Sequence, residues 1–141
     1  MLRRIYAAMV IAITAIAGSV VAASPASASG TSNFYVCGPL AGCSYEATFG
    51  QIIWHNRTAT VQGEAWNDGV TTTIAVFQAY AGSTLIDSES VSVVEGSLPI
   101  NFNIGDPDLR GGINRIKITV CYEPAPRVCG NPINYSEPIT P

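Results

Sequence analysis

The sequence LPINFNI, from Leu98 to Ile104, alternates apolar and polar residues with a strict period of two. Because successive side chains of a β-strand point to opposite faces, this alternation predicts a strand with one face in a core and the other in water. A second segment, Asn114 to Glu123, repeats the pattern, and its apolar face carries Ile116, Ile118, Val120 and Tyr122. These two segments indicate an all-β fold.

Similar segments, separated by Gly, Asn, Asp and Pro, are found along the rest of the chain. They predict further strands at Tyr45–Trp54, Thr58–Trp66, Thr71–Tyr80, Leu85–Val93 and Ile133–Tyr135. No long run of helix-forming residues occurs at helical spacing. Seven or eight short strands with turns at regular intervals favour a two-sheet antiparallel β-sandwich with immunoglobulin-like topology.

The first 28 residues resemble a secretory signal peptide. Arg3 and Arg4 precede an uncharged stretch from Ile5 to Ala23, and Ala26-Ser27-Ala28 forms a small-x-small cleavage site. A membrane anchor is the competing interpretation, because the uncharged stretch approaches the roughly 20 residues that cross a bilayer. Its Ala-rich composition, without Leu or Phe, and the cleavage site favour the signal peptide. We therefore expect a secreted, extracellular protein that is not embedded in a membrane after cleavage.

Cleavage after Ala28 would leave 113 of the 141 residues, a single domain from 29 to 141. This part has five basic and ten acidic residues, a net charge of about −5. Nucleic acids and anionic membranes require clustered Lys and Arg, and here only Arg115 and Lys117 lie close together. We therefore expect no nucleic-acid partner.

The four cysteines of an exported protein are expected to form two disulfides, for which three pairings exist. We predict Cys37 with Cys43 and Cys121 with Cys129. Cys121 shares the polar phase of its strand, so it is expected to bind a neighbouring surface segment rather than join the two sheets. The predicted strand Thr58–Trp66 contains no cysteine, which departs from antibody domains, so any relation to them is architectural. Spacings of six and eight residues do not suit a metal site, and we predict none.

Residues suited to catalysis are few. The only histidine, His55, follows a predicted strand and is expected to lie in a solvent-facing turn. The strand-borne carboxylates, Glu64, Glu89 and Glu123, occupy polar phases with no predicted cleft between them. Without a catalytic cluster or a cofactor motif, we predict neither an enzyme nor a cofactor.

Calcium binding at Asp106 and Asp108 is an alternative interpretation of the turn-rich segment Gly105–Gly112. Calcium takes six to eight oxygen ligands, and two aspartates supply too few. The simpler interpretation is a connecting loop whose turn is set by Pro and Asp.

Two residues are candidate binding residues. Trp66 shares the polar face of its strand and would be a ring exposed for sugar binding, unless a bulge at Gly63 turned it inward. Arg127 lies between Cys121 and Cys129 in a loop stiffened by prolines, an arrangement that would present a scissile-bond mimic to a trypsin-like protease.

We predict a secreted, non-enzymatic interaction module whose loops contact an extracellular protein or glycan. The two alternatives are a protease inhibitor that presents Arg127 and a small carbohydrate-binding module that uses Trp66. The fold alone does not choose among them.

Overall fold

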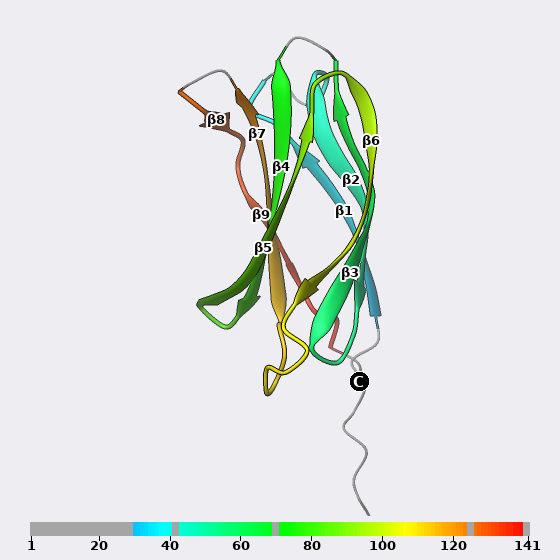
Figure 1. Ribbon diagram of the computed structural model, residues 1–141, viewed down its shortest axis with the longest axis vertical. Helices are drawn as coiled ribbons and strands as arrows, with labels where there is room; N and C mark the ends of the chain where they lie inside the picture. The colour runs from blue at the N-terminus through cyan, green and yellow to red at the C-terminus, as the bar shows by residue number, and fades with distance from the viewer. Residues whose placement is uncertain (1–29, 41–42, 69–70, 124–125, 140–141) are drawn as a thin grey trace, which may run out of the picture.

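The computed structural model describes residues 30–40, 43–68, 71–123 and 126–139, and these residues form nine strands in two layers (Figure 1). The first sheet contains β1 (Gly30–Cys37), β2 (Glu46–Trp54), β3 (Thr58–Asn67) and β6 (Gly96–Gly105). The second contains β4 (Thr72–Ala81), β5 (Thr84–Val93), β7 (Arg115–Glu123), β8 (Val128–Cys129) and β9 (Ile133–Ser136). The predicted all-β sandwich of two antiparallel sheets is confirmed.

The order of the strands is β1-β2-β3-β6 in the first sheet and β5-β4-β7 in the second, where β8 and β9 both pair with β7. The chain passes between the sheets from β3 to β4, from β5 to β6 and from β6 to β7. Apart from β1, this connectivity is that of an immunoglobulin-like sandwich, in which two sheets exchange strands through Greek-key connections. The strand β1 extends the first sheet at its β2 edge.

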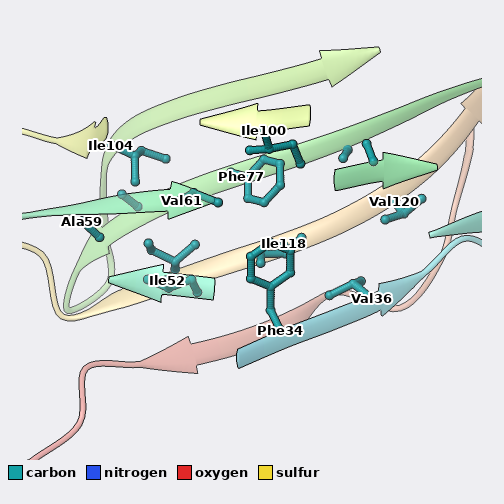
Figure 2. Packing of buried hydrophobic residues seen from close by; sticks show 14 of the residues in the cluster. Phe34, Val36, Ile52, Ala59, Val61, Phe77, Ile100, Ile104, Ile118 and Val120 are labelled. Atoms are coloured by element: carbon teal, nitrogen blue, oxygen red, sulfur yellow. The ribbon is translucent and has the colours of Figure 1, made fainter. Parts of the chain in front are cut away.

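The core lies between the two sheets, where the apolar phases of their strands meet (Figure 2). The ring of Phe77 on β4 contacts Phe34 on β1 and Phe102 on β6 edge to face, with ring centroids 6.0 and 5.3 Å apart. Burying a side chain such as Phe77 contributes about 1.5 to 3 kcal/mol, to which each edge-to-face pair adds about 0.5 to 1.5 kcal/mol. The ring of Phe77 in the second sheet therefore links β1 and β6, the two edge strands of the first sheet.

Trp54 is buried at the end of β2, and its indole Nε1 donates a hydrogen bond to Ser32 Oγ over 3.0 Å. On β9, Tyr135 accepts a hydrogen bond from the backbone N–H of Tyr35 and packs against Phe34 at a centroid distance of 6.3 Å. This contact closes the side of the sandwich between β1 and β9.

Two glycines face each other at the middle of the first sheet. Gly50 on β2 pairs directly with Gly63 on β3, and their outer neighbours in the same row are Phe34 and Ile100. A Cβ at Gly63 would overlap the carbonyl oxygen of Phe49 and lie 2.8 Å from the Gly50 Cα. The close approach of β2 and β3 at this point therefore requires glycine on both strands.

The strands differ from the sequence expectations in one register shift and in two additional strands. β3 keeps one register with both neighbours over its whole length, so Gly63 forms no bulge. The register shift occurs instead between Ala79 and Tyr80, where β4 pairs with β5. The strand β1 and the two-residue β8 were not predicted, although Phe34 and Val36 of β1 alternate with polar residues and are buried.

Both predicted disulfides are present. Cys37 and Cys43 connect the end of β1 to the segment before β2, and Cys121 on β7 pairs with Cys129 on β8. Cys121 lies in the predicted outer phase, and it is buried without belonging to the core cluster. Two disulfides are consistent with an oxidising compartment.

The predicted signal peptide, residues 1–28, lies outside the described residues. In the part of the chain that the structure describes, no helix has the length and apolar character needed to span a bilayer.

Candidate functional site

The outer face of the first sheet carries four amide side chains in a single row. Asn33 pairs with Gln51, Gln51 with Gln62, and Gln62 with Asn101, so the row crosses β1, β2, β3 and β6. All four side chains are exposed. With neighbouring strands about 4.8 Å apart, this amide row extends over roughly 14 Å.

The amide row follows from the alternation of the strands. Each of its residues is in the opposite phase to the buried side chains of the same strand, such as Phe34, Ile52, Val61 and Ile100. Since a side-chain amide has two N–H donors and one carbonyl acceptor, the row presents donors and acceptors together. It is suited to groups that both donate and accept, such as hydroxyls.

Two aromatic rings lie next to the amide row, each two residues from an amide of the same strand. Tyr35 on β1 pairs with Phe49 on β2, and their rings stack with centroids 6.0 Å apart and planes inclined by 25°. The exposed fractions are 56% for Tyr35 and 36% for Phe49. An exposed cross-strand aromatic pair contributes only about 0.2 to 1 kcal/mol to a sheet. Stability alone therefore gives little reason for two rings at this place.

The row that begins with Tyr35 and Phe49 continues across β3 and β6 with Glu64 and Pro99. Glu64 is exposed, and its Oε2 accepts a hydrogen bond of 3.1 Å from Ser97 Oγ. The following row holds Trp66, which lies between Ala47 and Ser97. Trp66 is thus on the outer face, half-buried, while its neighbour Ala47 is only 1% exposed.

A chain of hydrogen bonds lies on the other side of the amide row. Thr60 Oγ1 donates to Asn103 Oδ1 over 2.7 Å, and it lies 2.8 Å from His55 Nε2. Because the single hydroxyl proton of Thr60 goes to Asn103, Nε2 of His55 is the donor in the second bond. His55 is exposed, as predicted, and it takes part in the polar surface of this face.

The charge of the face is low. Among the described residues in its outward phase, Glu64 is the one acidic side chain, and none is Lys or Arg. The cations occupy other regions. Arg57 donates to the Pro107 carbonyl oxygen, and Arg115 lies over the Tyr80 ring in the second sheet at 4.1 Å. The face is therefore nearly neutral.

Arg127, the other candidate binding residue, is not part of this face. It forms an ion pair of 2.8 Å with Glu123, and both side chains are about half exposed. It lies directly before β8, which the Cys121–Cys129 disulfide holds against β7. The structure therefore gives the guanidinium an intramolecular partner.

The carboxylate of Asp106, in the β6–β7 connection, is hydrogen-bonded within its own turn. Asp106 Oδ1 accepts the backbone N–H of Asp108 over 2.8 Å, and the Asp106 carbonyl oxygen accepts that of Leu109. Glu64, Glu89 and Glu123 lie on three different strands. Within the described ranges, no three His, Cys, Asp or Glu side chains form a group able to hold a metal ion.

The sequence interpretation identified Trp66 but missed the amide row and the Tyr35–Phe49 pair. The signal for Tyr35 was available, because Asn33 and Tyr35 alternate with Phe34 and Val36. The row itself depends on which strands are neighbours, and in particular on the pairing of β3 with β6.

Comparison of the chain with protein-family models, with curated proteins and with solved structures found no match, and function is therefore inferred from the site alone.

Proposed function

We propose that the protein is an exported, non-enzymatic interaction module whose contact surface is the outer face of the β1-β2-β3-β6 sheet. The observation that carries this proposal is the stacked Tyr35–Phe49 pair, exposed beside the amide row. Large aromatic side chains are enriched where proteins bind partners, and a rigid sheet holds them at little entropic cost. The inner face of the same sheet forms the core and keeps these rows in place.

Export rests on the signal-like segment Met1–Ala28 and on the two disulfides, which suit an oxidising compartment. On this proposal the secreted domain begins at Ser29. Mass spectrometry of protein from the culture medium should give the mass of residues 29–141, and a secreted form that retains Met1–Ala28 would contradict it.

No catalytic role is assigned to the described residues. His55 has Thr60 as its hydrogen-bond partner, and the three strand-borne glutamates lie apart. The face offers contact and hydrogen bonding rather than a nucleophile beside a base.

We favour this face over the protease-inhibitor hypothesis for Arg127. An inhibitory arginine must enter the specificity pocket of the protease, and Arg127 would first have to give up its ion pair with Glu123. An exposed pair of this kind contributes about 0.2 to 1 kcal/mol, which binding through Arg127 would lose. Binding at the Tyr35–Phe49 pair breaks no ion pair among the described residues.

The test is retention of the purified protein on the insoluble extracellular material of the producing cells. The double variant Tyr35→Ala with Phe49→Ala should bind at least tenfold more weakly than the wild type. Leu85→Ala is the matched control, because Leu85 is an exposed apolar residue on β5 of the second sheet. Thermal unfolding establishes that both variants are folded, and equal retention of all three proteins would contradict the proposal.

A further inference from the structure

We infer that the ligand of this face is an uncharged polysaccharide, bound with its sugar rings against the Tyr35–Phe49 pair and its hydroxyls on the amide row. This inference rests on the proposed function and names the class of ligand. Two independent features of the face support it: the chemistry of its rows and the absence of Lys and Arg from its described outward residues.

The two adjacent rows supply the two contacts that a sugar ring requires. A pyranose has an apolar face of C–H groups, which an aromatic ring accepts because its π-face is electron-rich. Its hydroxyls each donate and accept a hydrogen bond, and they match the amides of Asn33 and Gln51. These amides lie two residues from Tyr35 and Phe49 along the same strands, about 7 Å away.

The row continues beyond these two amides to Gln62 and Asn101. A monosaccharide above the rings would leave this half of the row without a contact. The repetition of the side-chain amide group over roughly 14 Å therefore fits a ligand that also repeats, a chain of linked sugars that crosses the strands.

Charge complementarity selects a neutral chain. The outward phase carries Glu64 and neither Lys nor Arg among the described residues, so a phosphate, sulfate or uronate would find no cation there. Nucleic acids and acidic glycans obtain much of their affinity from such cations. Binding should accordingly change little when the salt concentration is raised.

The side-chain amides provide a direct probe. In ¹⁵N-labelled protein, the NH₂ signals of Asn33, Gln51, Gln62 and Asn101 should shift saturably on addition of a neutral hexasaccharide. The probes are the hexamers of β-1,4-glucose, β-1,4-N-acetylglucosamine, β-1,3-glucose and α-1,4-glucose, and hexagalacturonate is the charged comparison. We expect at least one neutral hexamer to bind and hexagalacturonate to leave these signals unchanged.

Variants locate the site. Tyr35→Ala and the pair Gln62→Ala with Asn101→Ala should each weaken binding of the neutral hexamer at least tenfold. Tyr35→Phe keeps the ring and should weaken binding less than Tyr35→Ala. The control Leu85→Ala lies in the second sheet and should bind as the wild type does.

Each outcome is informative. If the extracellular material retains the protein through Tyr35 and Phe49 but no neutral hexamer binds at millimolar concentration, the inference is wrong and the proposed function stands. Loss of that retention after protease treatment of the material, or binding of hexagalacturonate alone, overturns the inference in the same way. A neutral hexamer that binds equally well to wild type and Tyr35→Ala contradicts both the inference and the assigned surface.

Discussion

Replacement of Gly63 by Ala tests the packing that holds the candidate face in place. Gly63 lies directly opposite Gly50, and the new Cβ would overlap the Phe49 carbonyl oxygen and lie 2.8 Å from the Gly50 Cα. Carbon atoms in contact prefer about 3.5 to 4.0 Å, so β2 and β3 would have to separate by roughly 1 Å. The atoms in the way are backbone atoms, which no rotamer change can move.

Overpacking of a well-packed core costs about 1 to 3 kcal/mol, and the backbone clash places Gly63→Ala at or above the upper value. A loss of about 3 kcal/mol corresponds to a melting temperature lowered by roughly 10 to 20 °C in a domain of this size. Thermal unfolding followed by circular dichroism measures the change. The same separation would displace Phe49, so ligand binding should weaken as well.

The matched control is Gln62→Ala, a substitution on the same strand that faces solvent. It should change the free energy of unfolding by no more than about 0.5 kcal/mol. If Gly63→Ala melts within a few degrees of the wild type, then β2 and β3 do not approach as closely as described, and the placement of the rows on the outer face loses its support.

Three further predictions concern other regions. In denaturant titration, the free energy of unfolding of the double variant Cys121→Ser with Cys129→Ser should be about 2 to 3 kcal/mol lower than that of the wild type, the value expected for a bond that closes a short loop; an unchanged midpoint would show that the disulfide does not stabilise the fold. Asn67→Ala should lower the free energy of unfolding by about 2 to 3 kcal/mol in the same titration, since the two N–H groups of the buried Asn67 Nδ2 lie among the carbonyl oxygens of Thr71, Val93 and Val94 and these hydrogen bonds would be lost; a decrease below about 0.5 kcal/mol, the size typical of surface substitutions, would refute this. Trypsin should hydrolyse a peptide substrate at the same rate with and without excess protein, because the proposed contact surface is the outer face of the first sheet and does not include Arg127; inhibition at submicromolar concentration would restore the inhibitor hypothesis.

The fold was predictable where alternation is strict. Leu98–Ile104 and Asn114–Glu123 correspond to β6 and β7, because a period of two on a half-buried strand reflects burial. The expectation is wrong for Leu98, which has the phase of the buried Ile100 but is 42% exposed near the start of β6. For Thr71–Tyr80, apolar residues in both phases left the inward phase open. The structure places Ala75, Phe77 and Ala79 in the core, while Ile74 on the outer side is also buried.

The candidate face was less predictable, because it depends on contacts between strands distant in sequence. For Trp66 the sequence left two phases open, outward or turned inward by a bulge at Gly63; β3 has no bulge, so the ring lies on the outer face and is half-buried. Its neighbours Ala47 and Ser97 come from the pairing with β2 and β6. Spacing along one strand cannot show that four amides on four strands share a row. The Cys121–Cys129 disulfide was predictable from one strand, since the outward phase of Cys121 indicates a bond to a neighbouring surface segment.

The most direct measurement for the proposed contact surface is a map of backbone amide chemical shifts in the purified protein on addition of solubilised extracellular material. The account predicts that the perturbed signals cluster on β1, β2, β3 and β6, centred on Tyr35, Phe49 and the amide row. Perturbations centred on Arg127, or on the outer face of the second sheet around Arg115, would contradict it.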